Sequence, residues 1–442
     1  MKRLFPTLAT LLALAPPALA QGLELPQALQ TLPRTLDWKS ADLNYESAVR
    51  QLEAAQAALG FKLSGGADYS LRESSGSNLI LSSTASIGLL PWSSSADAVR
   101  SAERALERAA LTRRDARNNL WITLHTQYFN LRQAQADLAV AQATLALRER
   151  QLQIVSAQNQ AGAATLSELL AAQQNLDTAR SGLVSAQGAL ELARLSLSNT
   201  LGQNPQQLGS PSTPPEEPSL PAESLEALLQ RALESRSDVL RALLQLREAE
   251  ENLASAERDR WIPNASVSAG YSSSGNSLSA GLNFKSGVAS VSAAVPLVQG
   301  TGGSPAQGYN LGLSLSVPLF DPVSDSRIHT AHTALQAARQ ALETARKAAE
   351  LDVRQKYQGL QTAKAAIAAA RAGLNAANQN LRTAQARLQA GTGTALDVQS
   401  AQLGLLQAQR NLEAALIQAQ LAALALQNAL GTDLTASLGG NR

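Results

Sequence analysis

The 442-residue sequence contains no cysteine, few aromatic residues and almost no net charge. Without cysteine, the chain cannot use thiol catalysis, disulfide bonds, cysteine zinc sites or a lipid on an N-terminal cysteine. Aromatic residues make up 3% of the chain although hydrophobic residues make up 45%, so alanine and leucine carry the apolar content, which favours long packed helices over a globular enzyme core. The 37 basic and 35 acidic residues nearly balance, which argues against a nucleic-acid-binding protein, because phosphate neutralisation needs a clustered basic surface.

The sequence also lacks an apolar run of the roughly 18 residues that a transmembrane helix requires. The nearest candidate runs from Leu4 to Leu14, after Lys2 and Arg3, and Pro16 follows it. With the small residues of 18–20, this pattern predicts a secretory signal peptide over residues 1–20. An exported chain that crosses a bilayer without such a helix must do so as a β-barrel, the other structure that satisfies every backbone group in lipid.

An internal repeat organises the rest of the chain. An offset of 229 residues pairs Gly162 with Gly391 (391 − 162 = 229) and Tyr128 with Tyr357, and it holds without a gap over residues 102–202. We therefore expect a first repeat over residues 21–202, a second over 223–431 and a C-terminal tail over 432–442. Residues 203–222 between the repeats contain six prolines and are predicted to form an extended, non-helical linker.

Leucines and related residues recur at every seventh position in both repeats. The runs are Leu124, Leu131, Leu138, Leu145 and Leu152, and then Val353, Leu360, Ile367, Leu374, Leu381 and Leu388. This spacing predicts long helices in left-handed coiled coils over about 95–202 and 326–431. The helix from about Ser326 to Gln389 would be on the order of 100 Å long at ~1.5 Å per residue. An isolated cytosolic coiled coil would need neither the export signal nor the strands that follow.

Alternating apolar and polar residues precede each long helix, over about 64–91 and about 263–320. The runs have roughly the length that a tilted strand needs to cross a membrane. Eight of the 15 aromatic residues lie in or beside these windows, and we predict that Tyr69, Trp92, Tyr271, Tyr309 and Phe320 mark the membrane rim. A soluble β-sandwich with one wet face is the alternative. Four strands per chain cannot close a barrel, because about eight are the fewest observed, so the prediction requires an oligomer.

The turns between the long helices carry the most specific motifs. Residues 387–403 contain a glycine, a short polar turn, Asp397 and then Ala401-Gln402, and residues 160–168 are the first-repeat counterpart. Asn199–Gly202 and Asn428–Gly431 end the two repeats alike. With the signal peptide and the paired heptad helices, this arrangement resembles the TolC-like outer-membrane efflux protein family (outer membrane factors) across essentially all of the mature chain.

The resemblance implies a fold, a function and partners. The fold would be an α+β membrane protein of tandem helix–β-hairpin–helix repeats, assembled as a homotrimer with a 12-stranded β-barrel in outer-membrane lipid and a long α-helical coiled-coil periplasmic tunnel. The function would be a passive exit duct of a tripartite efflux pump or type I secretion system. The partners would be a periplasmic adaptor protein and an inner-membrane transporter, with no cofactor, metal or nucleic acid. An exported coiled-coil spacer of the cell envelope, without transport activity, is the alternative function.

The same resemblance suggests roles for single residues. Gly162, Thr165, Gly391 and Thr394 are implied to face the adaptor at the helix tips. The pore-constriction candidates are Asp397, its first-repeat counterpart Glu168, and Ser400, which stands where the family prototype has a second acidic residue. The simpler interpretations are a helix N-terminal charge for Asp397 and turn positions of positive φ for the two glycines.

Two further patterns bear on strands and chemistry. Residues 277–297 contain two further runs of alternating apolar and polar residues. The family has two strands per half, so these runs indicate an extra hairpin or a lengthened strand pair. His329 and His332 lie three residues apart, but a third metal ligand is missing from the pattern, so we interpret them as surface residues. No G-x-S-x-G motif occurs, and we expect no enzyme activity.

Overall fold

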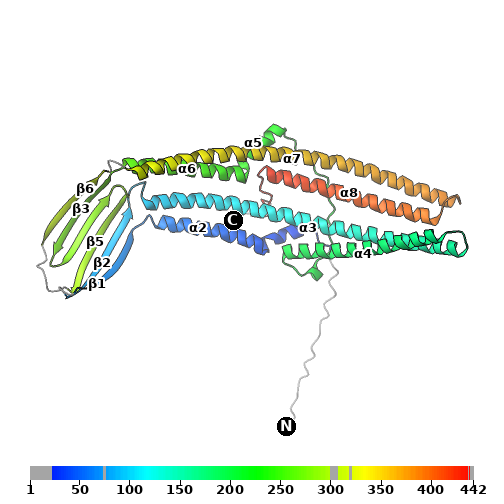
Figure 1. The fold of residues 1–442 in the computed structure, drawn as a ribbon, viewed down its shortest axis with the longest axis horizontal. Coiled ribbons are helices and arrows are strands. Elements are labelled where there is room, and N and C mark those ends of the chain that lie inside the picture. Colours follow the sequence, from blue (N-terminus) through cyan, green and yellow to red (C-terminus); the bar gives the residue numbers. More distant parts are fainter. Residues whose placement is uncertain (1–21, 73–75, 299–306, 318–320, 437, 439–442) are drawn as a thin grey trace, which may run out of the picture.

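A computed structural model describes residues 22–72, 76–298, 307–317, 321–436 and 438. The molecule is elongated, with a β-sheet at one end and helices running away from it to two turns at the other end (Figure 1). The predicted signal peptide and Phe320 lie outside the described residues. Among the helices that the structure describes, none is both long and apolar enough to cross a membrane.

The two halves of the chain repeat one order of elements. The first half contains α1 (Leu25–Thr31), η1 (Leu32–Arg34), α2 (Leu36–Ala57), β1 (Lys62–Arg72), β2 (Gly76–Gly88), α3 (Ser94–Gln160) and α4 (Leu166–Leu201). The second contains α5 (Leu225–Ser235), α6 (Ser237–Trp261), β3 (Asn264–Ser273), β4 (Asn276–Asn283), β5 (Val288–Val298), β6 (Gly308–Ser316), α7 (Pro322–Gln389) and α8 (Ala395–Ala429). Each half thus places short helices before its strands and a pair of longer helices after them.

The longest helices, α3 and α7, have 67 and 68 residues and are each about 100 Å long at ~1.5 Å per residue. Near the sheet, α2 packs on α3 and α6 packs on α7; towards the far end, α4 and α8 take those places (Figure 1). The heptad prediction is confirmed at Leu124, Leu131, Val353, Leu360 and Ile367, which are buried. The positions nearer the tips are half-buried in the single chain, and Leu388 is exposed. Alanines between these positions allow close approach of the helix backbones.

The Pro-rich linker joins the halves near the middle of the molecule. It is not extended throughout: Pro205–Gln207 form a 3₁₀ turn, η2, because the Asn204 side chain accepts a hydrogen bond from the Gln206 N–H and proline suits the first helical position. Beyond η2, Pro211 bridges Leu23. The buried Tyr128 hydroxyl donates to the Leu23 carbonyl at 2.7 Å and accepts from the Thr213 N–H at 2.9 Å, which ties the linker to α3.

The described strands form one antiparallel sheet of six, in the order β1-β2-β5-β4-β3-β6. The expectation of four strands per chain, on which the count of twelve for a trimer rested, is therefore corrected. Residues 276–298 form an extra hairpin rather than a lengthened pair, because Ser274 and Gly275 adopt φ values of 50° and 86° and fold β4 back onto β3. Two successive positive φ values are the requirement of a tight two-residue hairpin turn.

Strand register separates the side chains into an apolar and a polar face. The apolar face is formed by Leu63, Ala67, Tyr69, Leu81, Ala85, Val291, Val295, Leu278, Val267, Leu311 and Leu313. Ser64, Ser82, Thr84, Ser292, Ser279, Ser268 and Asn310 point to the other side. Within the single chain, Tyr309, Leu311 and Leu313 are 90%, 83% and 77% exposed. A continuous, uncovered apolar sheet face is the surface that a lipid-facing barrel wall presents.

Candidate functional site: membrane band, helix tips and central junction

Aromatic side chains stand at the two ends of the sheet. Tyr69, Tyr271 and Tyr309 lie towards the end away from the helices, where the Tyr271 and Tyr309 ring centroids are 4.8 Å apart. Phe61, Trp92, Trp261 and Phe284 lie at the helix end. Phe61 and Tyr69 are eight residues apart along the chain, about 26 Å at ~3.3 Å per residue. Because barrel strands are tilted by about 40°, the two rows would lie about 20 Å apart along the membrane normal, which is close to the ~25 Å height of the apolar band between aromatic girdles.

The two turns farthest from the sheet have the same geometry. Gly162 and Gly391 have φ values of +74° and +73°. In the first turn, the Ala163 N–H donates to the Gln158 carbonyl at 2.8 Å; in the second, Thr392 donates to Arg387 at 2.9 Å. These positions are related by the offset of 229 residues (387 − 158 = 229). A Cβ at either glycine would meet nothing within 4 Å, so backbone conformation rather than space requires glycine here.

A capping box follows each turn, at the start of α4 and of α8. The Thr165 hydroxyl accepts from the Glu168 N–H at 3.2 Å while the Glu168 carboxylate accepts from the Thr165 N–H at 2.7 Å. Thr394 and Asp397 make the same exchange, at 3.2 and 2.8 Å. The box satisfies N–H groups that the first helical turn leaves unpaired. Ser400 lies exposed in α8, three residues beyond Asp397.

These hydrogen bonds also lower the pKa of the two carboxyl groups. The backbone N–H of Thr394, then its hydroxyl, and then the charge of Arg387 lower the pKa of Asp397 below its ordinary value. The backbone N–H and hydroxyl of Thr165 lower the pKa of Glu168 in the same way. Both tips therefore present exposed, ionised carboxylates whose orientation is fixed by the helix start.

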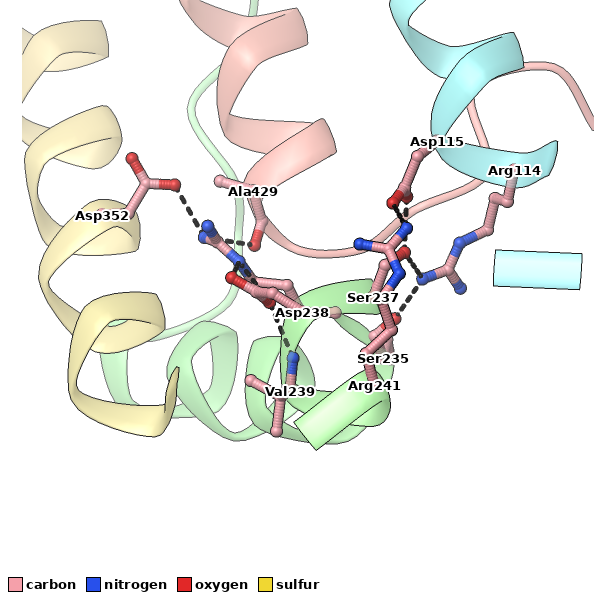
Figure 2. Close-up of polar contacts among 10 residues, drawn as sticks. Arg114, Asp115, Ser235, Ser237, Asp238, Val239, Arg241, Asp352 and Ala429 are labelled. Atoms are coloured by element: carbon pink, nitrogen blue, oxygen red, sulfur yellow. Dashed lines mark hydrogen bonds and ion pairs between the residues drawn. The ribbon is translucent and has the colours of Figure 1, made fainter. Parts of the chain in front are cut away.

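A charged cluster that the sequence did not predict lies where α5 breaks into α6 (Figure 2). The Arg236 guanidinium donates to Asp352 of α7 at 2.6 Å, to both oxygens of Asp238 at 2.9 Å and to the Ala429 carbonyl at the end of α8 at 3.5 Å. Burial lowers the pKa of Arg236, but the hydrogen bond and charge of Asp352 and the charge of Asp238 outweigh it and raise that pKa. Arg236 thus joins three helices as a permanent cation.

The same break is bonded to the first half of the chain. Arg114 of α3 donates at 2.6 Å to both the Ser235 carbonyl and the Ser237 hydroxyl. Asp115 of α3 accepts from Ser237 and pairs with Arg241 (Figure 2). The cluster, hereafter the α5–α6 junction, borders a charged cavity of about 330 Å³. Its carboxylates are paired with arginines, so the arrangement holds helices together and offers no poised nucleophile or base.

The sequence contains a weak signal for the α5–α6 junction. Ser235, Ser237 and Asp238 lie within four residues, and serine and aspartate favour helix starts over helix interiors. That signal would have placed a helix break there. It would not have identified the partners, because Arg236 and Asp352 are 116 residues apart.

His332 lies 3.9 Å from Glu257, and no group of three potential metal ligands occurs among the residues that the structure describes.

Comparison with known proteins agrees with this geometry. The sequence matches the family described as outer membrane efflux protein over residues 28–203 and 228–432. The chain belongs to the outer membrane efflux protein family. It is therefore an efflux channel of the outer membrane that extends into the periplasm, and not an enzyme.

Solved outer-membrane proteins share the fold. The chain is similar to VceC from Vibrio cholerae, with 20% identity, a TM-score of 0.66 and coverage of 92% of this chain and 96% of that one. It resembles the CmeC outer membrane channel of Campylobacter jejuni, with 18% identity, a TM-score of 0.70 and coverage of 91% and 84%. The MtrE outer membrane channel of Neisseria gonorrhoeae, in an open state, matches at 21% identity and a TM-score of 0.64 over 92% and 89%. No curated protein matches the sequence.

Proposed function

We propose that three copies of this chain form a passive exit duct that receives its substrate from an inner-membrane transporter through a periplasmic adaptor. The duct serves a tripartite efflux pump or a type I secretion system. The observation that carries the proposal is the pairing of an uncovered apolar sheet face at one end with two matched tips at the other, about 100 Å away at ~1.5 Å per helical residue. That length allows one molecule to meet both the outer membrane and a partner deep in the periplasm.

The tips support adaptor docking by Gly162, Thr165, Gly391 and Thr394. The two turns of one chain repeat the same backbone hydrogen bonds, so a trimer would present six similar turns. A partner with one recognition mode can then bind every tip. The exposure of these residues in the single chain is compatible with that contact.

The acidic residues beside the tips support a constriction. Asp397 is exposed and ionised, and its capping box limits its rotamers. Three copies around one axis would place three such charges at the tunnel entrance, with Glu168 and Ser400 contributing a second charge and a polar group. A ring of carboxylates favours cations over anions.

Accumulation of a fluorescent efflux substrate in cells tests this function. Deletion of the chain should raise accumulation, wild type should restore export, and the Gly162→Val/Gly391→Val protein should assemble without restoring it. If deletion alters the spacing of the envelope layers and leaves both accumulation and drug susceptibility unchanged, the exported spacer is the correct function instead.

A further inference from the structure

The hairpin β4–β5 differs from the other strands in how it meets the helices. β1 follows α2, β2 leads to α3, β3 follows α6 and β6 leads to α7, whereas β4 and β5 are joined to each other at the helix end by residues 284–287. Along the chain, the hairpin is inserted between β3 and β6, which still pair with each other. In the sheet, it lies between β3 and β2, the inner strands of the two halves (Figure 1).

The hairpin β4–β5 continues both the apolar face and the polar face of the sheet. Leu278, Ala280 and Leu282 oppose Ala293, Val291 and Ala289, which continues the apolar face. On the polar face, the hydroxyls of Ser279 and Ser292 hydrogen bond at 2.7 Å. β5 pairs with β2 from Gly88 back to Ile80. A plug inside the lumen or an external loop would need neither this alternation nor continuous pairing with both neighbours.

The helix-side turn of the hairpin is hydrogen bonded to the segment between β2 and α3. The Trp92 indole N–H donates to the Phe284 carbonyl at 3.0 Å, and the N–H groups of Leu89 and Leu90 donate to the Gly287 carbonyl at 2.9 and 3.2 Å. Gly287 has a φ of +67°, and a Cβ there would lie 3.0 Å from the Leu90 Cβ and 3.2 Å from that of Ser93. Both the conformation and the space at this contact therefore require glycine.

The helices α3 and α6 border a cavity and share ion pairs below the hairpin. A cavity of about 560 Å³, bordered by Trp92, Arg100 and Arg258, lies between α3 and α6 under the turn. The ion pairs Arg104–Glu251 and Arg108–Glu248 join the two helices there. Two extra strands between β2 and β3 add roughly 10 Å of sheet, at ~4.8 Å per strand, between the helix pairs.

We infer that β4–β5 is a permanent part of the barrel wall, so that the trimer of the proposed function encloses 18 strands (3 × 6 = 18). The strands alternate in direction across the sheet, so the edge strands β1 and β6 are antiparallel and β1 of one copy can pair with β6 of the next. Even strand number and antiparallel closure are the requirements of such barrels. Because barrel diameter grows roughly in proportion to strand number, the lumen would be about 1.5 times as wide as that of a 12-stranded barrel.

Engineered disulfides test the wall position independently of the oligomer, because the native chain has no cysteine. Ala85→Cys/Val291→Cys joins the opposed β2 and β5 positions, and the matched control Ala85→Cys/Ala269→Cys joins β2 to the residue of β3 that lies level with Ala85 across the sheet. After oxidation of the membrane-inserted protein, mass spectrometry should find the β2–β5 disulfide in most molecules and the β2–β3 disulfide in few. The reverse result would show that β2 and β3 are neighbours and would overturn the inference.

Cryo-electron microscopy of the purified oligomer in nanodiscs then counts strands and subunits. Eighteen strands around three subunits support the inference, and twelve strands around three subunits overturn it. Six wall strands per chain in an assembly of another size would retain the hairpin assignment and refute the trimer of the proposed function. The two failures are therefore distinguishable.

Discussion

Thr394 and Asp397 show how much of a tip depends on two side chains. Their reciprocal hydrogen bonds lower the pKa of Asp397. Because the folded pKa lies below the ordinary value of 3.8, ionisation stabilises the native tip fully above that value, and the stabilisation is lost as pH falls through the lower folded pKa. The carboxylate is charged throughout the physiological range.

This acidity predicts the pH dependence of ion selectivity. In reversal-potential measurements across a KCl gradient, cation preference should be lost as falling pH protonates Asp397. Wild type should keep the preference to lower pH than Thr394→Ala, because the hydrogen bonds from Thr394 lower the pKa of Asp397. Thr394→Ala removes the hydroxyl donor and frees the helix start, so the midpoint should move upwards in pH. Asp397→Asn should weaken cation preference at neutral pH. Selectivity that is identical in wild type and Asp397→Asn would exclude Asp397 from the constriction.

The sequence predicted individual tip residues where the two repeats carry them at equivalent positions. Gly162 and Gly391 lie at equivalent positions and proved to share a positive φ, and Glu168 and Asp397 proved to be the third residues of matching capping boxes. Their functional roles stay predictions. No sequence pattern predicts the pairing of Arg236, because its partners come from three separate helices. Pairings between residues so far apart in the sequence cannot be inferred from local spacing.

At the scale of elements, the tip turns give a sharp prediction. Valine at Gly162 and Gly391 meets no steric obstacle but disfavours the left-handed backbone by ~1–2 kcal/mol or more at each site. The altered turns should reduce export by at least about tenfold, on the basis of that energy at two sites, so that the protein fails to restore export while trimer assembly is retained. Gly162→Asn/Gly391→Asn is the matched control, since asparagine tolerates this conformation, and it should export normally. Wild-type export by the valine protein would remove the docking assignment.

The α5–α6 junction predicts an unequal effect of two neutralising substitutions in α7. Asp352→Asn removes the carboxylate charge that pairs with Arg236 at 2.6 Å, although Asp238 remains, and should destabilise the fold by about 1–3 kcal/mol. Glu350→Gln removes an exposed pair with Arg354 and should cost about 0.5 kcal/mol or less. Denaturant unfolding would measure the loss of stability in each variant, and hydrogen exchange at Ser235–Val239 would show whether the junction itself opens. Equal effects would show that the junction does not hold the helices together.

Element prediction succeeded for helices and was incomplete for strands. The heptad pattern predicted α7 to end at Gln389, where it does end, because a glycine turn and a long apolar seam are strong local signals. The strands β4 and β5 alternate small or polar residues with alanine, leucine and valine, and such alternation fits either a new hairpin or a longer strand pair. Pairing across the sheet, which the sequence does not encode locally, decides between them.

At the scale of the whole molecule, the few aromatic residues and the uncharged polar residues are concentrated in particular regions. Most described aromatic residues outside the helix core border the sheet. The polar face of the sheet is mainly serine, threonine, asparagine and glycine, and it also carries Lys62 and Asp68, whose charges are opposite. A lumen of that composition exerts little selection by charge. We therefore expect selectivity to arise at the helix tips and not in the membrane band.

Planar-bilayer recording of the purified oligomer, with its mass determined in the same preparation, tests the central claim most directly. The account predicts a trimer that inserts into the bilayer and conducts ions with cation preference, and that loses this preference in Asp397→Asn. A protein that is monomeric in detergent and non-conducting in bilayers would contradict the exit-duct function.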